Sequence, residues 1–392
     1  MSRNWESSPL SKLLNVQNGY AFNSKKFNNS YGKPLIRIRD LKNGFETKTF
    51  YEGGYDDKFV VKSGDFLIGM DGNFSCQEWR GGDALLNQRV CRLQGFSDTL
   101  LPRFLFYGIN KYLKDIEDVT TYTTVKHISS KRIKQICFPL PPLPEQKQIV
   151  SILDKAFEGI DKAIANTEKN LANARELFES YLNDVFTQKG EGWVDATLSE
   201  MALEFGRGKS KHRPRNAKFL YGGDYPFIQT GNIRNANHFI TKFTQTYSEE
   251  GLKQSKLWPK GTVCITIAAN IAETGIMTFE GCFPDSVIGM IPDPLKTTSE
   301  YVEYVLQLFR SELQKKGKGS AQDNINVGTF KEQTFPFAKL DQQKAIVKKL
   351  DALNVEKLRL SAIYQRKLEA LNELKQSLLQ KAFSGELTKD AA

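Results

Sequence analysis

Two dense groups of basic side chains are the first residues in this sequence whose type and spacing suggest a chemistry. Between Lys12 and Lys42 there are seven lysines and arginines against the single acid Asp40. Ammonium and guanidinium groups bind phosphate oxygens, and a guanidinium also offers paired donors to base edges. A solvated basic face is the alternative for any one of these residues. The candidate DNA contacts are Lys25, Lys26, Arg37 and Arg39. Alternating apolar and basic positions over residues 34–39 predict a strand whose face carries both arginines.

The second basic group lies between Glu204 and Asp224, where six lysines and arginines occur with no acid among them. They are Arg207, Lys209, Lys211, Arg213, Arg215 and Lys218. A loop of this charge density is typical of an arm that contacts the phosphate backbone, and we favour that interpretation over a solvated loop. The first five of the six are candidate DNA contacts.

A polar stretch rich in hydroxyl groups, residues 120–129, adds Lys126 and the imidazole of His127 to the candidates. Its counterpart in an internal repeat is residues 321–326, where Asn324 takes the place of His127. Different hydrogen-bonding groups at equivalent positions are what two modules that read different DNA sequences need. The alternative for His127 is an ordinary polar loop at the entry of a helix.

A similar exchange occurs in a strand-like segment, residues 226–233, which corresponds to residues 34–41. Gln229 stands where the earlier segment has Arg37, and Asn232 stands where it has Asp40. The framework is kept while the polar groups change, which again indicates two readers of different sequence. The candidates in this segment are Gln229, Asn232 and Arg234.

The residues that catalysis or a bound cofactor needs do not form a recognisable pattern. Three histidines lie far apart, five cysteines show no metal-ligand spacing, and no Ser-His-Asp pattern stands out. No Asn/Asp-Pro-Pro-Tyr/Phe stretch is present to grip an extruded adenine, and no glycine-rich segment suggests an S-adenosylmethionine pocket. We therefore expect a chain that binds and does not catalyse, with no metal or cofactor of its own. We expect the cysteines to be free and mostly buried thiols in a reducing compartment.

An internal repeat defines the elements that must position the candidate residues. A shift of 197 positions aligns residues 138–154 with residues 335–351 without a gap, so that Asp154 meets Asp351. A repeat of this length indicates two copies of one structural unit.

Each copy begins a long amphipathic helix. Pro144 fits the first helical position, and Glu145 lies in the first turn, where an acid is favoured. From Val150 to Val185 apolar residues recur at spacings of three and four, which is a coiled-coil seam. Lys357 interrupts the second seam. We expect the two helices to pair with each other in antiparallel fashion, because that makes the two halves equivalent, although the seam alone does not exclude a parallel pair.

The repeat, together with short β-like runs between the helices, predicts an α+β protein. It consists of two mixed α/β globular domains separated by two long helices, which form an antiparallel coiled coil with pseudo-two-fold internal symmetry. The expected boundaries are residues 1–142 for the first globular domain, 143–187 for the first helix, 188–338 for the second globular domain, 339–386 for the second helix and 387–392 for a tail.

Length and net charge agree with two domains and an anionic partner. A chain of 392 residues is too long for one core. Lysine and arginine exceed aspartate and glutamate by 55 to 45, a formal charge of +10 with a pI near 9.1, which favours nucleic acid as a partner. The N-terminus lacks an apolar signal core and no apolar run approaches the ~20 residues that span a bilayer. We expect a cytoplasmic protein with no membrane partner.

Two divergent modules, each followed by a matching long helix, resemble the DNA-specificity subunit of type I restriction-modification systems over the whole chain. The strongest part is PPLPEQKQIVSILD at residues 141–154, which is similar to the family's first conserved region. Residues 336–385 resemble the second.

Two phrases of the first module also match recognition domains of that family. They are MDGN at residues 70–73 and NQRV at residues 87–90, and the first makes Asn73 a further candidate. The second module departs from the phrases, with IAAN at residues 267–270 and DSV at residues 285–287. Base-reading residues are therefore not carried over from one module to the other.

The resemblance implies that each globular domain is a target recognition domain that reads one half of a split site in double-stranded DNA. It implies that the paired helices set the spacing and dock two methylation subunits, with restriction subunits as further partners. S-adenosylmethionine, ATP and magnesium are then expected on the partner subunits only. The candidate docking residues on the first helix are Lys155, Glu158 and Lys162. The alternatives are a stand-alone DNA-binding protein, a specificity factor of another phage-defence methylation system, and a structural coiled-coil adaptor.

Overall fold

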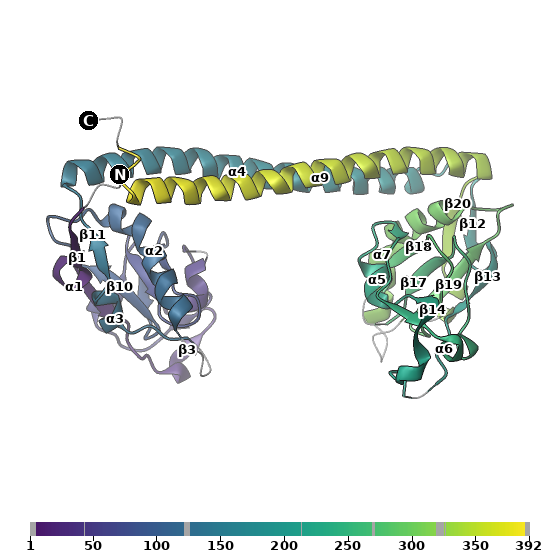
Figure 1. The fold of residues 1–392 in the computed structure, drawn as a ribbon, viewed down its shortest axis with the longest axis horizontal. Helices are drawn as coiled ribbons and strands as arrows, with labels where there is room; N and C mark the ends of the chain where they lie inside the picture. The colour runs from purple at the N-terminus through teal and green to yellow at the C-terminus, as the bar shows by residue number, and fades with distance from the viewer. Residues whose placement is uncertain are drawn as a thin grey trace. The chain divides into compact units, whose positions relative to one another are not determined.

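The computed structural model describes residues 5–42, 44–120, 126–212, 214–268, 271–318, 325 and 327–388. The chain divides into two compact units (Figure 1). The first comprises Met1–Thr167 with Lys367–Ala392, and the second comprises Glu168–Arg366. Each unit contains one globular module together with parts of the two long helices, α4 (Leu143–Thr187) and α9 (Leu340–Phe383).

Within the described residues, the first module contains two larger sheets, a two-stranded pair and one long covering helix. The four-stranded antiparallel sheet has the order β2 (Asn15–Asn18), β10 (Val90–Gln94), β7 (Phe66–Gly69) and β8 (Cys76–Glu78). The five-stranded sheet has the order β3 (Phe27–Asn28), β5 (Phe50–Tyr51), β4 (Lys33–Ile36), β9 (Ala84–Leu86) and β6 (Val60–Val61). Helix α2 (Pro102–Val119) packs on the four-stranded sheet, where the rings of Phe66 and Phe106 stack 4.9 Å apart. The short helices are α1 (Leu10–Leu13) and α3 (Ser130–Lys134).

The second module has one larger sheet. Its strand order is β13 (Ala202–Arg207), β19 (Val287–Pro292), β17 (Val263–Thr266), β18 (Thr274–Met277) and β15 (Phe239–Ile240), with β15 parallel to β18. A separate pair is formed by β14 (Tyr221–Phe227) and β16 (Gln245–Tyr247). Helix α7 (Ser299–Lys318) packs against β17, β18 and β19. The short helices are α5 (Thr230–Arg234), α6 (Glu249–Lys253) and α8 (Val327–Glu332).

The two modules repeat the same framework, as the alignment predicted. Strand β17 begins and ends 197 residues after β7, and α7 begins 197 residues after α2. In each module the first strand pairs with the last one before the long helix. These pairs are β1 (Ser7–Pro9) with β11 (Cys137–Pro139), and β12 (Val194–Thr197) with β20 (Thr334–Phe337). The chain therefore enters and leaves each module at the same place, beside the start of its helix.

Helices α4 and α9 run antiparallel within each unit, which confirms the expected coiled coil. In the first unit the ammonium of Lys375 on α9 pairs with Asp161 on α4, and Thr388 donates a hydrogen bond to Glu145 at 2.8 Å. Residue numbers thus fall on one helix as they rise on the other. The second unit shows the same direction, since Lys349 lies 4.8 Å from the ring centroid of Tyr181 and Lys357 lies 4.1 Å from that of Phe178.

Lys357, which interrupts the apolar pattern of the second seam, contacts an aromatic ring on the other helix. Its aliphatic stem is half-buried and its ammonium lies over the ring of Phe178, an arrangement in which a cation and an aromatic face attract each other. Burial lowers the pKa of Lys357 below its usual value, and nearby acids such as Glu179 oppose that shift. A lysine at a seam position is thus accommodated by an aromatic partner on the other helix.

One buried glutamine joins each long helix to its module. Gln146 has no exposed surface, and its Nε2 donates to the carbonyls of Thr99 and Pro141 at 2.8 Å each. Its Oε1 accepts from the backbone N–H of Leu101 at 2.8 Å. The repeat preserves this arrangement. Gln343, also fully buried, donates to the carbonyls of Lys296 and Ala338 and accepts from the hydroxyl of Thr297.

A tyrosine–aspartate contact makes a second duplicated attachment. Tyr107 on α2 donates its hydroxyl to Asp154 on α4, and Tyr304 on α7 donates to Asp351 on α9 at 2.7 Å. Both tyrosine pKa values are raised, first by burial and then by the adjacent carboxylate. The phenol therefore stays a donor, and the same two contact types orient each helix start against its module.

The cysteines agree with the expectation of free and mostly buried thiols. All five cysteines are free, and all except Cys137 are buried. Burial raises the pKa of Cys282 to about 11 and that of Cys91 to about 12. Within the described ranges, the structure contains no helix with the length and apolar character needed to cross a membrane.

We predict that Gln146→Ala lowers the free energy of unfolding by about 3 kcal/mol, because it leaves one buried carbonyl, one part-buried carbonyl and one N–H without their side-chain partner. Chemical denaturation of the full chain measures this change. The control is Gln148→Ala, a half-exposed glutamine in the same helical turn, for which the expected change is about 0.5 kcal/mol or less. Equal losses in the two variants would contradict the role given to Gln146.

Candidate nucleic-acid interface

Three separate segments of the first module meet at one polar turn. The backbone N–H of Met70 donates to the carbonyl of Arg89, that of Ile128 to the carbonyl of Met70, and that of Gly72 to the carbonyl of Lys126, each at 2.9 Å. These bonds bring MDGN (residues 70–73) and NQRV (residues 87–90) together with the segment that carries Lys126 and His127. We call these three segments together, with Asp71 at their centre, the Asp71 cluster.

Asp71 contacts two exposed side chains within the cluster. Its Oδ1 lies 2.6 Å from Nδ1 of His127, and its Oδ2 lies 3.4 Å from Nε of Arg89. Asn73 is exposed beside them, after Gly72, whose φ of 77° favours glycine. Lys126 differs from the expected free cation, because its Nζ donates to the carbonyl of Glu117 at 2.6 Å. Three predicted residues, Asn73, Lys126 and His127, are therefore gathered in one place.

The strand predicted over residues 34–39 is wrong in its second half. Strand β4 ends at Ile36, and Ile38–Lys42 forms a 3-10 helix. The physical reason is Asp40, whose buried carboxylate accepts from the backbone N–H of Arg37 at 2.9 Å and turns the chain. The two arginines therefore do not share a strand face.

The guanidinium of Arg39 is directed toward the turn. Its Nη2 donates to the hydroxyl of Thr49 at 2.7 Å, and its Nε lies 3.6 Å from Asp40. Arg37 is half-buried. The other two candidates of this region, Lys25 and Lys26, are exposed in a separate 3-10 helix, Ser24–Lys26.

The basic loop of the second module is partly neutralised by one aspartate. Arg215 donates to both carboxylate oxygens of Asp285 at 2.9 and 2.7 Å. Nε of Arg207 donates to the main-chain carbonyl of Asp285 at 2.9 Å. Lys209 and Lys211 are exposed. Arg213 lies outside the described residues. The contacts to Asp285 fix the two ends of the loop and leave its middle as the more strongly basic part.

The remaining candidates of the second module surround the start of α5. The side-chain oxygen of Asn232 accepts from the backbone N–H of Gln229 at 2.9 Å, so that Asn232 stabilises the turn into the helix. Nε2 of Gln229 donates to Oε1 of Gln245 at 2.8 Å, and both amides are exposed. Arg234 is exposed at the end of α5. Asn324 lies outside the described residues.

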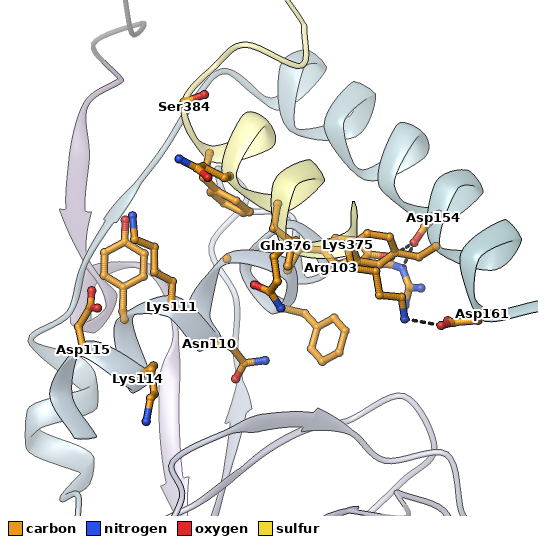
Figure 2. Close-up of a pocket in the computed structure, with 18 of the residues that line it drawn as sticks. Arg103, Asn110, Lys111, Lys114, Asp115, Asp154, Asp161, Lys375, Gln376 and Ser384 are labelled. Carbon is orange, nitrogen blue, oxygen red and sulfur yellow. Dashed lines mark hydrogen bonds and ion pairs between the residues drawn. The ribbon is translucent and has the colours of Figure 1, made fainter. Parts of the chain in front are cut away.

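A groove of about 1120 Å³ lies within the first unit, beside α2, the start of α4 and the end of α9 (Figure 2). Its lining includes Arg103 and Asp154, which form an ion pair at 2.6 Å, together with Lys375 and Glu158. Of the predicted docking residues, Glu158 lines this groove. The ammonium nitrogen of Lys162 lies 2.6 Å from Oε1 of Glu158. The third docking residue, Lys155, is exposed on α4 and is not among the lining residues.

The chemistry that these groups offer is recognition by hydrogen bonds and charge. Guanidinium, ammonium, amide and imidazole groups are the types that contact phosphates and base edges. In the part of the chain that the structure describes, no group of three or more His, Cys, Asp or Glu is arranged to hold a metal ion.

The fold and these groups define a protein of two duplicated modules that present side chains of the types that bind nucleic acid. The family model of the type I restriction modification DNA specificity domain matches residues 2–172 and 190–371. The matched ranges include both modules and most of both helices, so the chain belongs to this family. It is a specificity subunit that binds DNA, in a family that is not catalytic. The match does not favour the alternatives, which were a stand-alone DNA-binding protein, a specificity factor of another phage-defence methylation system and a coiled-coil adaptor.

Two curated relatives match most of the chain. The type I restriction enzyme EcoBI specificity subunit of Escherichia coli is 28% identical over 423 aligned positions, which cover 98% of this chain and 86% of the relative. The type I restriction enzyme MjaVIII specificity subunit of Methanocaldococcus jannaschii is 23% identical over 379 positions, with 90% and 86% covered.

Two solved structures share the fold. One comes from work on complex assembly and conformational transition of the type I R-M system; it has a TM-score of 0.77 at 19% identity and 98% coverage of both chains. The HsdS subunit from Thermoanaerobacter tengcongensis has a TM-score of 0.54 at 18% identity, with 98% of this chain and 97% of that chain covered.

Sequence reasoning missed three residues that organise the polar groups. Asp71 stands inside the phrase MDGN, yet only Asn73 was singled out from it. Asp285 belongs to the segment in which the second module departs from the family phrases, and that departure was the available signal. Gln245 had no signal, because only the paired strands β14 and β16 bring it to Gln229.

Proposed function

We propose that this chain reads a split site in double-stranded DNA, with one half-site for each module, and that the two long helices set the number of unread base pairs between them. The observation that supports the proposal best is the duplicated attachment of module to helix. Gln146 and Gln343 make equivalent buried hydrogen bonds, while the exposed groups of the two modules differ. Equal frameworks with unequal surfaces suit two readers of different sequence.

We further propose that the chain acts in the cytoplasm with partner subunits that perform the chemistry. Two methylation subunits and the restriction subunits would bind it, and S-adenosylmethionine, ATP and magnesium would be held by those partners. In this scheme the specificity subunit selects the position on the DNA, and the partner subunits carry out the chemical reaction. The charged surface of α4 around Glu158 and the groove beside it are our proposed docking surface for a methylation subunit.

The DNA contacts in this proposal fall into two classes. Exposed lysines such as Lys25, Lys26, Lys209 and Lys211 suit phosphate contacts, which position the protein without reading sequence. The amides of Gln229 and Gln245 and the groups of the Asp71 cluster suit contacts with base edges, because their hydrogen-bonding atoms are held in place by neighbours.

Exchange of the first module tests the split-site proposal. Residues 1–140 are replaced by the equivalent segment of another family member, and the methylated sequence is mapped in cells that also carry the methylation subunit. One half-site is expected to change while the other half-site and the spacer remain, since Gln343 and the second module are untouched. A change in both half-sites would refute the assignment of one half-site to each module.

For the basic loop we predict that Lys211→Ala weakens binding of the full chain to all DNA sequences alike and reduces the slope of log K against log salt by about one, because one phosphate contact is lost. Titration of labelled duplexes at several salt concentrations measures both effects. Lys189→Ala is the matched control, since Lys189 is exposed but pairs with Asp195 at 2.7 Å. A sequence-dependent loss at Lys211 would point instead to a base contact.

For the docking surface we predict that charge reversal of Lys155, Glu158 and Lys162 together weakens assembly with the methylation subunit at least about tenfold, because each reversal juxtaposes like charges across an interface. Co-purification and sedimentation measure assembly, and the melting temperature of the chain alone is expected to stay the same, since all three residues are exposed. Undiminished assembly would show that these residues are only solvent-exposed and do not dock the methylation subunit.

A further inference from the structure

The Asp71 cluster orients an arginine that sequence reasoning did not select. Arg89 lies in NQRV, and its main-chain carbonyl is fixed by the N–H of Met70 at 2.9 Å. Its side chain is 56% exposed, and its Nε lies 3.4 Å from Oδ2 of Asp71, which is 22% exposed. Among the described residues, Asp71 is the ion-pair partner of this guanidinium.

The contact with Asp71 engages one edge of the guanidinium. Its Nε faces the carboxylate, so the two terminal nitrogens, Nη1 and Nη2, remain as a planar pair of donors. An exposed ion pair of this kind adds little to stability, but it restricts the rotamers of a long side chain. The arrangement therefore orients the arginine and does little to stabilise the module.

Asp71 also fixes the second exposed group of the cluster. Its Oδ1 lies 2.6 Å from Nδ1 of His127, which leaves Nε2 of that ring as the outward nitrogen. The third basic residue is turned away, because the ammonium of Lys126 donates to the carbonyl of Glu117. Arg89 and His127 are thus the two basic groups that the cluster presents to a ligand.

The ligand that fits an arginine held in this way is a base edge. Guanine presents two acceptors, O6 and N7, in the major groove, and their spacing matches paired guanidinium donors. A phosphate fits less well, because the Asp71 carboxylate lies 3.4 Å from Nε of the same guanidinium and repels a second anion. The uncharged guanine edge carries no such penalty.

We propose that Arg89 reads a guanine in the half-site of the first module through O6 and N7, and that Asp71 is the positioning residue that orients it. The inference rests on the proposed function, since it assigns a base contact within the site that the first module reads. It adds a specificity-determining residue and the identity of one base.

Selection from random DNA duplexes by the purified full-length chain tests this assignment. Sequencing of bound DNA is expected to show a split sequence with a strongly preferred guanine in the half-site of the first module. Arg89→Ala and Arg89→Lys are both expected to lose that preference by roughly ten- to a hundredfold, because neither offers paired planar donors, while the other positions keep theirs. Asp71→Asn is expected to cause a smaller loss at the same position without a new preferred base.

The control is Arg80→Ala, in the same module, where an arginine side chain that is 70% exposed pairs with Glu78 at 3.6 Å. Its selected sequence is expected to be that of the wild type. A uniform loss of affinity in Arg89→Ala that Arg89→Lys restores would identify a phosphate contact and overturn the inference, while the proposed function would stand. The same loss at guanine in Arg80→Ala would also overturn it.

Two further outcomes complete the test. A wild-type chain that selects no split sequence would overturn the proposed function and this inference together. Melting curves report whether each variant folds; if Arg89→Ala does not fold, the charge-conserving Arg89→Lys decides, because the bond between Met70 and Arg89 is a main-chain bond that both variants keep. Unchanged base preferences in a folded Arg89→Lys chain would then refute the guanine contact.

Discussion

The buried amide at the start of each long helix is the interaction on which the rest of the structure depends. A glutamine offers donors and an acceptor from one planar group, so it can satisfy backbone atoms of the module and of the helix entry at once. Gln146 and Gln343 do this with no exposed surface. An apolar side chain in either place would leave these buried carbonyls without donors. The free-energy cost of losing these hydrogen bonds therefore stabilises one orientation of each module on its helix within the unit.

The two modules combine this fixed framework with polar groups that differ between them. The tyrosine–aspartate contacts at Asp154 and Asp351 are the same in both halves. Away from the helices the first module has the Asp71 cluster, and the second has a pair of hydrogen-bonded glutamines together with a loop anchored on Asp285. The attachments to the long helices are therefore kept while these polar groups differ, and this combination lets one fold carry two specificities.

Local and periodic features could be predicted from the sequence, whereas contacts between distant segments could not. The seam repeats over many turns, so its two helices were recognised, and their antiparallel pairing was expected because it makes the two halves of the repeat equivalent. The strand at residues 34–39 was wrong because alternation ignores the side chain of Asp40, which captures a backbone N–H and ends the strand. Arg215 was singled out, but its partner Asp285 lies 70 residues away and only the folded sheet joins them. The sequence thus indicated which polar residues to select, but it did not indicate how their side chains are oriented.

The antiparallel pairing also determines what happens while the chain is being made on the ribosome. Helix α4 is complete at Thr187, but the partner that covers its seam begins only at Leu340. At about 5–20 residues per second, the nascent chain needs roughly 10–40 s to supply α9. During that interval apolar residues such as Leu182 lack their final cover, and the α4 of another nascent chain presents the same stripe. Translation speed and the spacing of ribosomes on the mRNA therefore affect whether α4 pairs with α9 of the same chain or with α4 of a neighbouring nascent chain.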